Sequence, residues 1–98
     1  MQQVECQISG NVQGVFLRAY IKECADVLDI VGFVENLSNG MVHMVAQAPA
    51  KDTLETLMRQ VREGSPLAQI ESVDTQWGHP DEIHEHFTIR QTTDSVDA

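Results

Sequence analysis

The chain has 98 residues, the size of one domain, and 42% of them are hydrophobic, which is enough for a single core. Its 15 acidic and 6 basic residues give a net charge of −9, which repels phosphate backbones and anionic lipid. We therefore expect neither nucleic acid nor a membrane surface as a partner. A site for a small anion would have to be built locally, from main-chain N–H groups and a few basic side chains.

The N-terminal third of the chain predicts a strand, a loop and a helix. Residues 4–10 alternate between apolar and polar side chains, as a half-buried strand does. Residues 10–15 contain two glycines and predict a loop. Apolar residues then recur at three- and four-residue steps over residues 17–30, which predicts an amphipathic helix.

The next segment predicts a hairpin. Residues 33–37 and 41–47 have the composition and alternation of strands, and Asn39-Gly40 lies between them. Asn-Gly is typical of the type I′ turn, because both of its central residues need a positive φ. We therefore expect a tight two-residue turn at this point.

A second helix and a fourth strand are predicted after the hairpin. Residues 50–63 carry an apolar stripe at helical spacing, with acidic residues in the early turns and arginines in the last. Residues 68–77 predict a strand whose alternation breaks between Ile70 and Val73. This break predicts a β-bulge near Ser72.

The end of the chain predicts one more short strand and a tail. Phe87 and Ile89 alternate as strand residues do, whereas residues 91–98 are polar and are expected to be disordered. The single domain is therefore expected to span residues 1–90. The order of elements predicts an α+β fold of the ferredoxin-like βαββαβ type, with two helices on one face of a four- or five-stranded, mainly antiparallel sheet.

The loop from Gly10 to Arg18 is a candidate anion site. A glycine-containing turn that leaves a strand and enters a helix can direct several main-chain N–H groups at one anion, and the helix start adds a partial positive charge. Arg18 stands at that start, where its planar guanidinium can bind two phosphate oxygens. The residues alone also fit a simple turn followed by a surface arginine.

Asn36 is the second candidate. It shares a strand face with Val34, which is predicted to look toward the helices and the loop. A polar amide on an inward-facing position needs a partner. The partner is either a buried main-chain group or a water molecule held beside a bound phosphate, and the pattern alone leaves both open.

Two motifs carry a resemblance to a known family. Gly-x-Val-Gln-Gly-Val-x-x-Arg, from Gly10 to Arg18, resembles the signature loop of acylphosphatases. Gly-x-Val-x-Asn-x-x-x-Gly-x-Val, from Gly32 to Val42, resembles their second signature. Both the order and the spacing match, and the resemblance covers roughly residues 4–90.

The resemblance implies the ferredoxin-like fold and the hydrolysis of acyl phosphates to a carboxylate and inorganic phosphate, without a metal or another cofactor. It also implies that Arg18 binds the phosphate, that Asn36 orients the attacking water, and that a phosphate oxygen of the substrate accepts the water's proton. The main chain of the loop is expected to surround the phosphate, and the substrate-binding residues are then Gln13, Gly14, Val15, Phe16, Leu17 and Arg18. Leu17 and Ala19 depart from the family's usual residues, which affects the expected rate and substrate fit.

A second resemblance concerns residues 66–73 and the run from Phe87 to Gln91, which look like the end of the acylphosphatase-like domain of hydrogenase-maturation carbamoyltransferases. The alternative interpretations are therefore an excised domain of such a protein that handles carbamoyl phosphate, or an anion-binding module without catalysis. The Asn-x-x-x-Gly hairpin favours the stand-alone enzyme.

The remaining polar features predict little chemistry. His84-x-His86 lies in an acidic stretch and fits a polar loop better than a metal site, so we expect no metal. Cys6 and Cys24 occupy apolar faces and are expected to be buried free thiols, with a disulfide as the alternative. No segment has the layout of a signal peptide or the length of a membrane span, so we expect a cytoplasmic monomer.

Overall fold

The structure is a computed structural model of the chain, and it describes residues 1–64 and 68–90. The tail predicted at residues 91–98 lies outside the described residues. The described chain forms these elements, in order: β1 (Gln2–Asn11), α1 (Leu17–Val27), β2 (Val31–Asn36), β3 (Val42–Ala48), α2 (Lys51–Glu63), β4 (Gln69–Gly78) and β5 (Phe87–Arg90).

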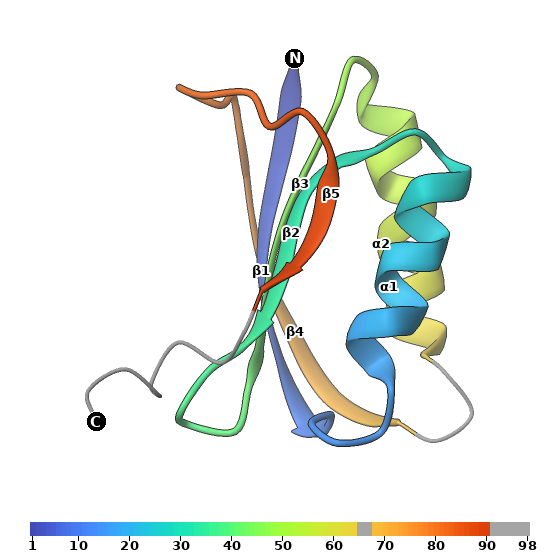
Figure 1. Cartoon of the computed structure of the whole chain (residues 1–98), viewed down its shortest axis with the longest axis vertical. Helices are drawn as coiled ribbons and strands as arrows, with labels where there is room; N and C mark the ends of the chain where they lie inside the picture. Colours follow the sequence, from blue (N-terminus) through green and yellow to red (C-terminus); the bar gives the residue numbers. More distant parts are fainter. Residues whose placement is uncertain (65–67, 91–98) are drawn as a thin grey trace.

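The strands form one sheet in the order β4-β1-β3-β2-β5, and both helices lie on the same face of it (Figure 1). All neighbouring strands pair antiparallel except β2 and β5, which pair parallel. The predicted ferredoxin-like fold is therefore confirmed, with the sheet extended to five strands. The parallel β2–β5 pair brings Phe87–Arg90 beside the strand that carries Asn36.

The core lies between the sheet and the two helices. Each central strand alternates, so that one set of side chains faces the helices and the other faces away from them. Inward-facing residues such as Cys6 and Met44 stand opposite each other on β1 and β3. The helices close the core with buried apolar residues, which are Leu17, Ile21 and Ala25 on α1 and Leu54, Leu57, Met58 and Val61 on α2.

The predicted bulge is confirmed in the β1–β4 pair. Ser9 pairs with Ser72, but the next residue, Gly10, pairs with Ile70, so Glu71 is the extra residue on β4. Gly10 has a φ of 127°, and a Cβ at this position would meet main-chain atoms of β4. The bulge thus needs glycine where β1 leads into the loop.

The first helix is shorter than its apolar pattern. It ends at Val27 instead of residue 30, because Asp29 adopts a left-handed conformation with a φ of 58°. Ile30 N–H then donates to the carbonyl of Ala25 at 2.9 Å, which closes the helix in the manner of a Schellman motif. Ile30 remains buried, so the apolar spacing continues although the helix does not.

The type I′ turn predicted at Asn39-Gly40 is wrong. Gly40 has a φ of 90°, but Asn39 is not among the residues with positive φ. Leu37 N–H donates to the Met41 carbonyl at 2.9 Å, and Gly40 N–H donates to the Leu37 carbonyl at 3.2 Å. The connection is therefore a longer loop that ends in one left-handed glycine. The Asn39 side chain stabilises this loop, because its Oδ1 accepts a hydrogen bond from Met41 N–H at 3.0 Å.

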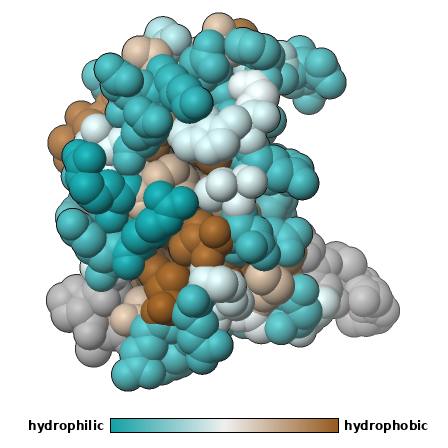
Figure 2. Space-filling model, turned by 180° about the vertical axis from the view of Figure 1, so that it is seen from behind, coloured by the Kyte–Doolittle hydropathy of each residue, from teal (hydrophilic) through white to brown (hydrophobic). Residues whose placement is uncertain are grey.

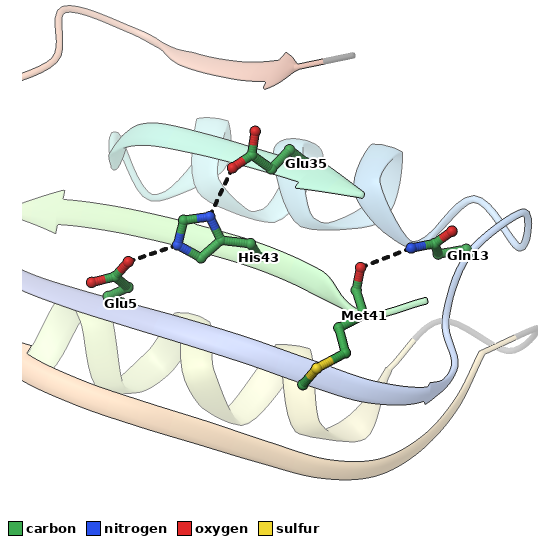
Figure 3. A network of polar contacts seen from close by, with 5 residues as sticks. All are labelled: Glu5, Gln13, Glu35, Met41 and His43. Carbon is green, nitrogen blue, oxygen red and sulfur yellow. Dashed lines mark hydrogen bonds and ion pairs between the residues drawn. The ribbon is translucent and has the colours of Figure 1, made fainter. Parts of the chain in front are cut away.

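The sheet face away from the helices carries polar side chains. His43 lies between two carboxylates, with its Nδ1 2.8 Å from Glu35 and its Nε2 2.7 Å from Glu5, so three neighbouring strands are linked on this face (Figure 3). Among the described residues, hydrophilic side chains also cover most of the surface seen from behind, where hydrophobic ones form small separate groups (Figure 2). Such small groups are ordinary for a protein surface.

Cys6 and Cys24 are both free thiols, as predicted, although only Cys6 is fully buried. Within residues 1–64 and 68–90, no helix has the length and apolarity that crossing a membrane requires. The same residues contain no group of three or more histidine, cysteine or acidic side chains arranged to hold a metal ion.

Candidate active site

A cavity of about 240 Å³ lies where the β1–α1 loop meets the end of β2. Its lining comes from three separate parts of the chain: the loop with the start of α1, the last residue of β2, and β5. The lining residues are Val12, Gly14, Phe16, Leu17, Arg18, Ala19, Asn36 and Ile89. They include one basic side chain and no acidic one, so the cavity suits an anion although the chain as a whole is acidic.

The loop brings main-chain N–H groups close to this cavity, because Gly14 and Phe16 to Ala19 are among its lining residues. Gly14 and Phe16 have left-handed conformations, with φ values of 73° and 62°, and Phe16 precedes α1 without a side-chain cap. The first N–H bonded within the helix belongs to Tyr20, which donates to the Phe16 carbonyl at 3.1 Å. The N–H groups at the helix start before Tyr20 are therefore available to an anion, and the helix dipole favours negative charge there.

Arg18 stands in the first turn of α1 and is one of the residues that line the cavity. Its Nη1 donates to the Arg90 carbonyl at the end of β5, at 3.0 Å. The guanidinium of Arg90 in turn lies 3.5 Å from the ring centroid of Phe33 on β2. One nitrogen of Arg18 is thus held by β5, while a guanidinium has further N–H groups to offer a ligand.

Asn36 ends β2, where it pairs with Val42 of β3 and is 8% exposed. Its side chain lines the cavity, and its Oδ1 is buried without a hydrogen-bond partner among the described residues. A buried amide without a partner is unfavourable, at about 1–3 kcal/mol for each unsatisfied group. The Oδ1 atom is therefore not held by a main-chain donor among the described residues, while Asn36 as a residue lines the cavity.

A model of the acylphosphatase family matches residues 4–89, which is most of the chain. This chain belongs to the acylphosphatase family. An acylphosphatase of Salinibacter ruber is 38% identical over 90 residues, which are 92% of this chain and 94% of that protein.

Solved structures agree with the family. The crystal structure of the acylphosphatase from Bacillus subtilis has a TM-score of 0.87 and 29% identity, and the match covers 92% of this chain and 99% of that one. Full-length HypF, in its phosphate- and nucleotide-bound form, has a TM-score of 0.77 and 23% identity, but the match covers only 12% of its chain. The likeness to HypF extends to the fold alone, whereas the likeness to the separate acylphosphatases extends over nearly their whole length.

The acylphosphatase motifs meet at the cavity, but the predicted binding residues do not all line it. Gly14, Phe16, Leu17 and Arg18 are lining residues, and Gln13 and Val15 are not. Val15 packs against the apolar core. The Gln13 side chain donates to the carbonyls of Leu37 and Met41, both at 2.8 Å, and so contacts the β2–β3 hairpin. The expected role of the loop was that of its main chain, which stays a prediction, and the Gln13 side chain is directed to the hairpin.

Sequence reasoning missed the part of the candidate site that β5 provides. Ile89 lines the cavity and the Arg90 carbonyl accepts a hydrogen bond from Arg18. The alternation of Phe87 and Ile89 predicted a strand, but no local signal shows that this strand pairs parallel to β2. That pairing connects residues far apart in the chain, and only the tertiary fold determines it.

A larger cavity of about 730 Å³ lies between α1 and β5, and it is a poorer candidate. Its basic residue, Lys22, is already engaged, because Nζ contacts Asp26 at 2.8 Å and the Phe87 carbonyl at 3.1 Å. Asp29 and Glu85 add negative charge to the lining. A phosphate would be repelled there, so size alone does not identify the acylphosphatase site.

The two thiols are unsuited to a phosphoenzyme mechanism. Burial raises the pKa of the Cys6 thiol to about 12, and burial also raises the pKa of Cys24. The nucleophilic form of cysteine is the thiolate, which such shifts disfavour at neutral pH. Neither cysteine lines the cavity beside Arg18.

Proposed function

We propose that this acylphosphatase hydrolyses small acyl phosphates at the 240 Å³ cavity, with Arg18 binding the phosphate and Asn36 placing the attacking water. The observation that supports these roles best is that the loop residues at the start of α1, Arg18 and Asn36 line one small cavity, and that Asn36 Oδ1 has no partner among the described residues. Pockets for drug-sized ligands are usually about 300–1,000 Å³, so a cavity of this size suits a small substrate.

Binding is expected to place the phosphate dianion against the start of α1. The N–H groups of the loop and Arg18 spread the charge of its oxygens, and they stay in contact as the phosphoryl group flattens in the transition state. The acyl group then extends toward the rim, where Phe16 is 75% exposed and Ile89 is 40% exposed. These two side chains give the rim an apolar character that suits an apolar acyl group.

The chemical step is a single in-line displacement. The water oxygen forms a bond to phosphorus as the bond from phosphorus to the acyl oxygen breaks, and the carboxylate leaves with the electron pair. Asn36 aligns the water opposite the leaving group. A carboxylic acid has a pKa of about 4, so the carboxylate leaves without a general acid. The water's proton passes to a phosphate oxygen, as the family resemblance implies.

The whole proposed site comes from one chain, which supports a monomer as the active species. A cytoplasmic location is also proposed, because a reducing compartment keeps thiols such as Cys6 and Cys24 free. The substrate class, acyl phosphates, follows from the family.

Hydrolysis of benzoyl phosphate tests the proposal. The wild type should release phosphate well above the spontaneous rate, and Arg18→Ala should lose about 10²–10³-fold in kcat/KM. The matched control is Arg59→Ala, which removes an exposed arginine from α2 and should keep wild-type kinetics. EDTA should leave the rate unchanged. If inorganic phosphate binds the wild type but benzoyl phosphate is not hydrolysed, the protein is an anion-binding module and the catalytic proposal is wrong.

A further inference from the structure

The side chain of Gln13 connects the phosphate loop to the β2–β3 hairpin. Its Nε2 lies 2.8 Å from the Leu37 carbonyl and 2.8 Å from the Met41 carbonyl. In Figure 3 the Gln13 amide, at the start of the loop, points to the Met41 carbonyl at the base of the hairpin. An amide NH₂ group has two donors, so this contact uses both of them.

The two carbonyls flank the hairpin connection next to Asn36. Leu37 directly follows Asn36, and its N–H donates to the Met41 carbonyl at 2.9 Å. Gln13 therefore contacts both sides of the last hydrogen bond of the hairpin. Gly14, which directly follows Gln13 in the loop, lines the cavity.

We propose that Gln13 is a positioning residue, whose side chain fixes the distance between the phosphate loop and Asn36. This inference rests on the proposed function, because it concerns the water that Asn36 places. The phosphate is bound by the loop and the start of α1, whereas the water is placed from β2. The nucleophile can stand in line with the leaving group only if these two parts keep a fixed separation.

The Gln13 side chain is the polar contact between the loop and the hairpin. Apart from Gln13, the loop offers the hairpin no side-chain hydrogen bond among those found in the described residues. Val15 packs the loop against the core, but Gly14 and Phe16 have left-handed conformations and the loop has no regular secondary structure that would fix its distance from the hairpin. A misplacement of about 1 Å can cost about 10²-fold in rate, so a loop released from the hairpin would slow the chemical step more than it would weaken phosphate binding.

The test replaces Gln13 with methionine, which has a similar length and no donor. In the hydrolysis of benzoyl phosphate, Gln13→Met should lower kcat by about 10–100-fold. The inhibition constant of inorganic phosphate should change by less than about threefold, because the main-chain donors remain. Gln7→Met is the matched control: Gln7 is an exposed residue of the same strand, β1, and this variant should keep the wild-type kcat.

A double-mutant cycle separates positioning from a merely structural role. If Gln13 acts through Asn36, adding Gln13→Met to Asn36→Ala should lower kcat by less than about threefold further. An equal loss in both backgrounds would overturn the inference, and so would a folded Gln13→Met with wild-type kcat. Gln13→Asn, whose side chain is one methylene shorter, serves as a second variant if the methionine variant fails to fold, and it should show the same non-additive loss.

An NMR titration with inorganic phosphate tests the link without catalysis. In the wild type, phosphate should shift the main-chain amide signals of residues 14–18 and the side-chain amide signals of Asn36. In Gln13→Met the loop shifts should persist, and the Asn36 shift should fall by at least half. If the Asn36 signals respond equally in both proteins, the inference is wrong. A wild type that hydrolyses no acyl phosphate would refute the proposed function, yet this titration would still decide the role of Gln13.

Discussion

Replacing Asn36 with leucine should make the protein more stable and far less active. Asn36 is only 8% exposed, and its Oδ1 has no hydrogen-bond partner among the described residues. A buried unsatisfied polar group costs about 1–3 kcal/mol, and an apolar side chain of similar shape does not carry this cost. Asn36→Leu should therefore raise the free energy of unfolding by about 1 kcal/mol, which for a domain of this size raises Tm by about 4–8 °C.

The activity should change in the opposite direction. Leucine cannot align a water beside the bound phosphate, and the loss of one well-placed polar group in the transition state costs about 10²–10³-fold in kcat. The inhibition constant of inorganic phosphate should change little, because Arg18 and the loop main chain remain. The assay pairs thermal unfolding with benzoyl phosphate kinetics, and Asn11→Leu is the control, since Asn11 is exposed and does not line the cavity.

Two results would refute this reasoning. If Asn36→Leu lowers Tm by several degrees, the amide makes a stabilising contact within the folded protein. If kcat stays within about threefold of the wild type, Asn36 does not place the nucleophile. A gain in stability together with a loss of turnover would be difficult to explain for a residue with a purely structural role.

Three further predictions concern the loop, the rim and the core. Gly14→Ala should lower Tm by about 4–16 °C, because Gly14 has a φ of 73° and an alanine in a left-handed conformation costs about 1–2 kcal/mol, although the new methyl group meets open space. An unchanged Tm would contradict this prediction. Ile89→Ala should raise KM for benzoyl phosphate about fivefold, as expected for about 1 kcal/mol of lost apolar contact, and should raise KM for acetyl phosphate less. If KM rises equally for both substrates, the acyl group does not contact Ile89. The pKa of Cys6 rises from 9.0 to about 12 through burial, so the unfolded chain loses this proton first and stability falls as pH rises from 9 toward 12. The free energy of unfolding, measured with urea, should fall between pH 7 and pH 10 by about 1.4 kcal/mol less in Cys6→Ala than in the wild type. An equal fall in both proteins would refute this contribution of Cys6.

Local patterns predicted most of the elements of this fold. The second helix was predicted at residues 50–63 and lies at Lys51–Glu63, because its apolar stripe, its charged ends and Gly64 all act within the segment itself. The bulge was also visible locally, since Ile70 and Val73 cannot both face the core of a strictly alternating strand. The hairpin loop could not be predicted locally, because the same Asn-Gly pair fits both a two-residue turn and a longer loop with one left-handed glycine.

The site was predictable only in part, since its parts meet through tertiary contacts. The motifs indicated Arg18 and Asn36, and both line the cavity, although their catalytic roles stay predictions. The contact between Arg18 and the Arg90 carbonyl depends on the parallel pairing of β5 with β2, which no local pattern specifies. The two hydrogen bonds of Gln13 likewise depend on how closely the loop approaches the hairpin.

The unfavourable features of this protein are concentrated at the proposed site. Phe16 adopts a left-handed conformation without being glycine, the start of α1 has no side-chain cap, and Asn36 Oδ1 lacks a partner among the described residues. Each of these features opposes folding, by about 1 kcal/mol or more. A phosphate would satisfy the uncapped N–H groups of the helix start, because they are donors and its oxygens are acceptors. The core beneath is apolar and closely packed, so it can hold the strained loop in place. Under the proposed function, an acidic chain binds its anion where the fold leaves donors unused, and these donors are in position before the substrate arrives.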